Sequence, residues 1–307
     1  MNGNEYLQKI LDDQTLKEDG PELKALREER DSVEALLRKE FENSNPIIRY
    51  GGSKAKRTMI KESYDLDIPC YFKCEDDDAG STLEEIFNNT RKALEKQYIV
   101  TPKTSALRLL SSSDQARGTY VHVDVVPGRF TDDKKEDCYL YVSNGDKCRL
   151  KTNLDVQIEH IRDSGWREAV RLCKLWKVRN GIQLKTLGLE LAVIEILNSG
   201  KPGAALDAQL VAFWEMWRDD PDSVKIEDPS NPHGNNLDGL LSSDVRRTLS
   251  FSSADSLRRL DESGWESIFG AAPEASDEKQ SARRIEVLTR ATTATSASAV
   301  KPWLDLR

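Results

Sequence analysis

The N-terminal part of the chain carries apolar side chains at the spacing of an amphipathic helix. In the segment DGPELKALREERDSVEALLRKEF they recur three, four or seven positions apart, at Leu23, Leu26, Val33, Leu36 and Leu37. Such positions share one helical face, and Pro21 suits a first helical turn, where a missing N–H costs nothing. We therefore predict that residues 4–43 are helical, with a break at the sequence NSNP.

Beyond this break the pattern changes to short runs that are rich in β-branched and aromatic residues, which favour strands. These runs are IIRY, YDLDIPCYF, YIVTPKTSALRLL, GTYVHVDVVPGRF and CYLYVS, with a helix expected from about Thr82 to Lys96. From about residue 155 the period is helical again. Helices are expected at about 155–163, 165–180, 185–198, 203–218 and 235–248.

This change of pattern near residue 150 predicts an α+β fold with two lobes. Residues 1–150 would form an α/β lobe, a mixed sheet with flanking helices, and would include a long N-terminal helix that bridges the lobes. Residues 151–270 would form a helical lobe. Residues 271–307 are rich in Ala, Ser and Thr, so we expect a flexible tail with at most one helix, at about Ser281–Arg290.

Charge and cysteine content narrow the functional classes. The chain has 307 residues and a formal net charge of -8, so it gives no strong signal for nucleic-acid binding, which depends on Lys and Arg. Any anionic ligand must meet a local basic cluster or metal ions. The five cysteines show no zinc-site spacing, and no apolar run approaches the roughly 18 residues of a membrane span. We expect reduced thiols, no signal peptide, no membrane partner and a cytoplasmic location.

Three aspartates on two expected strands are candidate metal ligands. Alternation along a strand places Asp65 and Asp67 on one face, with Leu66 and Ile68 on the other. Asp124 lies within a β-branched run, where an aspartate is unfavourable. If the two strands pair, the three carboxylates converge and could hold two magnesium ions about 4 Å apart. A surface salt-bridge cluster is the alternative reading of an isolated pair of aspartates.

The sequence GGSKAKRTMIKES precedes the first two aspartates and is a candidate phosphate site. Gly51 and Gly52 allow a ligand to approach the backbone closely, and Ser53 offers a hydroxyl donor. For most of the lysines and the arginine that follow we expect a solvated helix face. We therefore predict that the two glycines and Ser53, more than these basic residues, bind the phosphate.

Taken together, these motifs resemble the nucleotidyltransferase core of the polymerase-β-like superfamily. Within it the chain resembles the CD-NTases, the cGAS/DncV-like nucleotidyltransferases of bacterial CBASS anti-phage signalling. Three later segments carry this closer resemblance, which spans about residues 20–250: REAVRLCKLWKVRNG, LKTLGLELAVIEIL and IEDPSNPHGNNL.

The resemblance implies roles for the candidate residues. Asp65 and Asp67 would bind two Mg²⁺ ions, for which Mn²⁺ can substitute in such enzymes. Asp124 would bind the catalytic ion and activate a nucleotide hydroxyl. Lys174 and Thr186 would join the Gly51–Ser53 segment in holding the triphosphate.

The activity that the resemblance implies is synthesis of a cyclic di- or trinucleotide, or an oligonucleotide, from NTPs with release of pyrophosphate. ATP or GTP, and pyrimidine NTPs as a further option, would be the substrates, and a separate effector would sense the product. Two alternatives stay open: a polymerase-β-like enzyme that adds nucleotides to RNA or protein, and a non-catalytic nucleotide-binding regulator.

Overall fold

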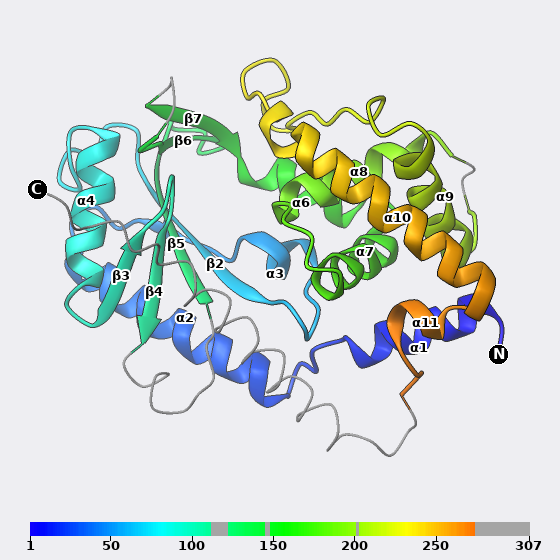
Figure 1. Ribbon diagram of the computed structural model, residues 1–307. Coiled ribbons are helices and arrows are strands. Elements are labelled where there is room, and N and C mark those ends of the chain that lie inside the picture. The colour runs from blue at the N-terminus through cyan, green and yellow to red at the C-terminus, as the bar shows by residue number, and fades with distance from the viewer. Residues whose placement is uncertain (112–121, 145–147, 201–202, 274–307) are drawn as a thin grey trace, which may run out of the picture.

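The computed structural model describes residues 1–111, 122–144, 148–200 and 203–273. It shows a mixed sheet with helices on one side of the molecule and a bundle of helices on the other (Figure 1). This confirms the predicted α+β fold. The helix that we expected at residues 281–290 lies outside the described residues.

The sheet places the two aspartate-bearing strands side by side. Its strands are β1 (Ile47–Ile48), β2 (Asp65–Phe72), β3 (Tyr98–Pro102), β4 (Leu107–Ser111), β5 (His122–Phe130), β6 (Asp137–Tyr141) and β7 (Arg149–Asn153). Their order is β1-β2-β5-β4-β3, and β6 pairs with β5 and β7. Strands β2 and β5 run parallel, whereas the other pairs are antiparallel.

The helices fall into two groups along the chain. Near the sheet lie α2 (Pro21–Glu40), α3 (Gly52–Lys56) and α4 (Leu83–Leu94). The bundle contains α1 (Gly3–Asp13), α6 (Leu154–Arg162), α7 (Arg167–Arg179), α8 (Thr186–Asn198), α9 (Leu206–Asp219), α10 (Ser243–Ser263) and α11 (Glu266–Phe269), with a 3-10 turn at Asp238–Leu241.

The N-terminal segment corrects one prediction, because it forms two helices instead of one. Helix α1 ends at Asp13 and α2 begins at Pro21, whose missing N–H suits a first helical position, so residues 14–20 separate the two helices. The two helices also bury their apolar faces in different cores: Leu7 of α1 packs with the helical bundle, and Leu26 of α2 packs with the sheet. The connection between the lobes is therefore a pair of helices (Figure 1).

Two further elements differ from the expectation. Strand β7 was not predicted, since the sequence RLKTN lacks an alternating apolar pattern. The helix expected at 235–248 is instead the 3-10 turn followed by α10, which extends to Ser263. Helix α10 buries Ser253 and Ser256 rather than large apolar side chains along much of its length, so its helical period is weak in the sequence.

Each group of helices has its own hydrophobic core. One core joins α1 to helices α7–α11, and the other joins α2 and α4 to strands β2, β4 and β5. The short helix α3 lies between them, where it contacts both β2 and α6 (Figure 1). The Gly51–Ser53 segment, which we predicted to bind phosphate, thus lies at the junction of the two cores.

Candidate functional site

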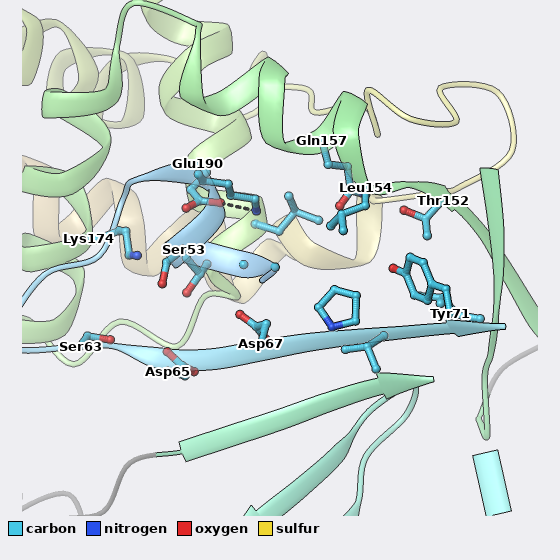
Figure 2. A pocket seen from close by; sticks show the side chains of 18 residues that line it. Ser53, Ser63, Asp65, Asp67, Tyr71, Thr152, Leu154, Gln157, Lys174 and Glu190 are labelled. Carbon is cyan, nitrogen blue, oxygen red and sulfur yellow. Dashed lines mark hydrogen bonds and ion pairs between the residues drawn. The ribbon is translucent and has the colours of Figure 1, made fainter. Parts of the chain in front are cut away.

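A cavity of about 300 Å³ opens at this junction. Strand β2 forms its floor, and helices α3, α6 and α8 form its roof (Figure 2). All but one of the residues predicted for the site line it: Gly51, Gly52, Ser53, Asp65, Asp67, Lys174 and Thr186. Asp124, the exception, lies on the neighbouring strand.

The floor of the cavity carries the first two aspartates as the alternation predicts. Leu66 and Ile68 are fully buried in the sheet core, so Asp65 and Asp67 point to the opposite face, toward α3 (Figure 2). The parallel register of β2 and β5 sets Asp67 directly beside Asp124. The predicted pairing of the two strands is confirmed.

The glycine turn lies in close contact with this carboxylate. Gly52 has a left-handed backbone (φ +49°), and an added Cβ atom would lie 1.6 Å from Asp67 Oδ2. The N–H of Gly51 donates to the carbonyl oxygen of Asp67 at 2.9 Å, which fixes the turn on the strand. Glycine is therefore required at position 52 both for its conformation and for its lack of a side chain.

The environment of Asp67 suits a cation. Burial, together with the negative charges of Asp65 and Asp124, raises the pKa of Asp67 to about 6. A hard divalent cation such as Mg²⁺ binds carboxylate oxygens and would relieve this repulsion. The donor chemistry of Asp65 and Asp67 thus fits the magnesium ions that the sequence resemblance implies.

Asp124 is held differently from our expectation. Its carboxylate accepts hydrogen bonds from Lys103 Nζ at 2.6 Å and from Arg108 Nε and Nη2 at 2.9 Å each. Burial alone would raise its pKa, but the hydrogen bonds from Arg108 and Lys103 outweigh this and lower the pKa of Asp124. The two cations occupy the oxygens that we expected to face a metal.

This arrangement corrects the expected convergence of three carboxylates. Among the residues that the structure describes, no group of three His, Cys, Asp or Glu side chains gathers closely enough to hold a metal ion. The antiparallel register places Arg108 of β4 directly opposite Asp124, so the arginine reaches this carboxylate from the adjacent strand. The three aspartates are neighbours on the sheet, and Asp124 is paired with protein cations.

Lys174 and Thr186 reach the cavity from the helical bundle. Lys174 is buried on α7, and its Nζ donates to the carbonyl oxygen of Thr58 at 2.8 Å. Burial lowers the pKa of Lys174. Thr186 is the first residue of α8, where the backbone N–H groups have no partner within the helix.

Sequence reasoning missed a buried ion pair at the roof of the cavity. Glu190 of α8 is fully buried and accepts from Lys56 Nζ at 2.9 Å and from Thr58 Oγ1 at 2.8 Å. Burial would raise the pKa of Glu190, but the charges of Lys56 and Lys174 outweigh this and lower it. Lys56 is thus buried instead of solvated. The signal was a glutamate within the apolar run GLELAVI.

The end of the cavity away from α3 has a different character. Tyr71, Leu140 and Leu154 line it with apolar surface, and Gln157 and Thr152 add a few polar atoms (Figure 2). None of these five residues was predicted from the sequence. Their elements lie far apart in the chain, so no short motif connects them.

Comparison with known proteins adds evidence at the level of structure. No protein-family model and no curated protein sequence matches the chain. The fold is similar to Escherichia coli MS115-1 CdnC solved with ATP, with a TM-score of 0.64, 20% identity and coverage of 89% of this chain and 99% of that one.

Two further solved structures show the same likeness. One is the CD-NTase CdnG of Bradyrhizobium diazoefficiens in complex with GTP (TM-score 0.64, 14% identity, 95% of this chain and 98% of that one). The other is the Vibrio cholerae cyclic AMP-GMP synthase DncV in complex with a linear intermediate (TM-score 0.53, 17% identity, 78% and 72%). The chain therefore has the fold of the CD-NTases, which confirms the fold that the sequence resemblance implies.

Proposed function

We propose that the protein is a CD-NTase that joins nucleoside triphosphates into a cyclic di- or trinucleotide, or an oligonucleotide, and releases pyrophosphate. One observation carries this proposal. The register of β2 and β5 sets Asp67 beside Asp124, and the Gly52 turn lies against Asp67 on the cavity side. A carboxylate pair below a glycine turn is an arrangement suited to a metal-bound triphosphate.

The phosphates would lie at the α3 end of the cavity. The backbone N–H groups of the Gly51–Ser53 turn and the Ser53 hydroxyl are donors to phosphate oxygens. Lys174 and Lys56 supply positive charge from the roof, and Thr186 adds a hydroxyl. These groups come from α3 and from the bundle helices α7 and α8, so the triphosphate would be bound where the sheet and the bundle meet.

Asp65 and Asp67 would hold the divalent cations, with Asp124 as the third carboxylate. Two Mg²⁺ ions, or Mn²⁺ in their place, stabilise the attacking and leaving oxygens of a displacement at phosphorus when bound. Asp124 would orient the attacking hydroxyl and accept its proton, for which its oxygens would have to exchange their contacts with Lys103 and Arg108. Lys103 and Arg108 keep this carboxylate ionised, because their hydrogen bonds lower its pKa.

The reaction follows from this placement. A 2′- or 3′-hydroxyl oxygen of one nucleotide forms a bond to the α-phosphorus of the bound triphosphate. The bond from that phosphorus to the bridging oxygen breaks, and pyrophosphate leaves. After one or two such transfers, a last transfer within the linear product, which releases its own pyrophosphate, closes the ring. The protein contributes mainly positioning and charge.

The test is incubation with the four NTPs and Mg²⁺ or Mn²⁺. The wild type is expected to release pyrophosphate, whereas the double variant Asp65→Asn, Asp67→Asn releases none. The matched control is Asp77→Asn, Asp78→Asn in an exposed loop, which makes the same charge change away from the cavity. Undiminished synthesis by the Asp65→Asn, Asp67→Asn variant would contradict the proposed function.

The biological setting is part of the same proposal. The similar structures of CdnC and CdnG hold ATP and GTP, and DncV is a cyclic AMP-GMP synthase, which supports a role in CBASS anti-phage signalling with a separate effector that senses the product. We place the protein in the bacterial cytoplasm. In the part of the chain that the structure describes, no helix is both long and apolar enough to cross a membrane.

A further inference from the structure

We infer that the Gln157 amide selects a nucleobase that carries an amino group where guanine and uracil carry a carbonyl oxygen, namely adenine or cytosine, for the nucleotide bound on the Gly51–Ser53 turn. The inference rests on the proposed function, since it assigns the base of the same triphosphate. It concerns the end of the cavity that the phosphate-binding groups leave free.

This end of the cavity has the shape of a base site. Its walls are apolar, formed by Val126, Leu140 and Leu154, which pack with Tyr71. The Tyr71 hydroxyl faces the open space (Figure 2). An apolar slot with a few placed polar atoms is typical of a site that binds a flat ring and fixes its orientation. The polar atoms at its rim therefore decide which base fits.

Hydrogen bonds on the side away from the cavity fix the orientation of the Gln157 amide. Its Nε2 atom donates to Asp228 Oδ1 at 3.4 Å and to Ser230 Oγ at 3.3 Å. An ionised carboxylate has acceptors and no donor, so the amide must turn its NH₂ group toward Asp228. Its Oε1 atom is left toward the cavity (Figure 2).

Asp228 cannot turn away, because it is itself fixed. It is 2% exposed and accepts from Ser230 N at 2.9 Å and from Ser230 Oγ at 2.7 Å. Its second oxygen accepts from Asn235 Nδ2 at 2.7 Å, and Asn235 also donates to the Lys151 carbonyl at 2.8 Å. The segment DPSNPHGNN is thus a loop that holds the amide of Gln157 in one orientation.

A fixed acceptor at the base site discriminates between bases. The amino groups of adenine and cytosine can donate to Gln157 Oε1. Guanine and uracil have a carbonyl oxygen at the corresponding ring position, so two acceptors would face each other without a proton between them. One hydrogen bond made or left unmade changes affinity by about fivefold or more.

The experiment is equilibrium dialysis of the full chain against the α,β-methylene analogues of ATP, CTP, GTP and UTP with Mg²⁺. The wild type is expected to bind the ATP and CTP analogues at least about fivefold more tightly than the GTP and UTP analogues. Gln157→Met, which keeps the length of the side chain, should remove this difference. Gln8→Met, on the exposed face of α1, is the matched control and should keep it.

A second variant tests the orientation itself. Asp228→Asn gives the neighbour both a donor and an acceptor, so the Gln157 amide can turn and the preference should fall while triphosphate binding remains. Equal binding of all four analogues by the wild type, or a preference unchanged in Gln157→Met, would overturn the inference and leave the proposed function intact. Binding of none would overturn the proposed function as well.

Discussion

Among single residues, Gly52 is the most tightly constrained in the candidate site. Its left-handed backbone and its contact with Asp67 leave no room for a side chain. The sequence predicted the glycine turn and the facing of Asp65 and Asp67, because both follow from local rules. It could not predict the cations on Asp124, because their contact depends on the pairing of β4 with β5, which no local pattern encodes.

Substitution of Gly52 tests this contact. Gly52→Ala would force Asp67 or the turn to move, and we expect roughly a hundredfold loss of synthesis, since a shift of about 1 Å at a reacting centre has this effect. Gly181→Ala is the matched control: Gly181 also has a positive φ (+63°), but nothing lies within 4 Å of an added Cβ. It should keep its activity. Equal losses of activity in the two variants would show that backbone strain, and not the contact with Asp67, causes the loss.

The raised pKa of Asp67 gives a stability prediction with a definite sign. Its pKa rises from 3.8 to about 6 on folding, so its contribution to stability is fully present below pH 3.8 and is lost as the pH rises through 6. In EDTA, Asp67→Asn should therefore raise the free energy of unfolding at pH 7.5, by about 3 kcal/mol, and have little effect at pH 4. Thermal unfolding at both pH values measures this.

The exposed Asp78 provides the control for that experiment, since Asp78→Asn removes a charge that folding does not bury. It should change stability little at either pH. Destabilisation by Asp67→Asn to the same extent at pH 4 and pH 7.5 would contradict the account, because a raised pKa requires the effect to depend on pH.

At the scale of elements, the contact between α3 and α8 joins the glycine turn to the helical bundle. The Lys56–Glu190 pair and the hydrogen bond from Thr58 to Glu190 are buried there. The period of the sequence predicted α7 and α8 closely, but it gave no sign that Lys56 is buried. A lysine on a short helix has the same local pattern whether a neighbouring element covers it or not.

Removal of Glu190 should show how much the buried contact between α3 and α8 contributes to stability. Glu190→Ala leaves Lys56 buried without its counter-charge, and we expect the free energy of unfolding to fall by about 3–5 kcal/mol. Urea denaturation measures this. Glu28→Ala, in an exposed pair with Lys24 (69% and 73% exposed), should cost less than about 1 kcal/mol.

A double replacement separates charge from shape. Lys56→Met combined with Glu190→Leu fills the same space with apolar side chains and should recover most of the stability that Glu190→Ala loses. If Glu190→Ala cost no more than Glu28→Ala, the pair would not hold the two elements together.

At the scale of the whole molecule, the site exists because two hydrophobic cores meet at α3. Strand β2 and the bundle helices α6, α7 and α8 all supply residues to the cavity, so neither the sheet nor the bundle forms the site alone. The change of period near residue 150 predicted two parts of different character. It did not predict that α1 would pack into the helical core, since an amphipathic stripe does not specify its partner. The division into domains stays a prediction.

Mass spectrometry of the product made from all four NTPs with Mg²⁺ tests the central claim most directly. The account predicts a phosphatase-resistant product with the mass of two or three nucleoside monophosphates less one water for each linkage, and none from Asp65→Asn, Asp67→Asn. An extended RNA, a nucleotidylated protein or the absence of any product from the wild type would contradict it.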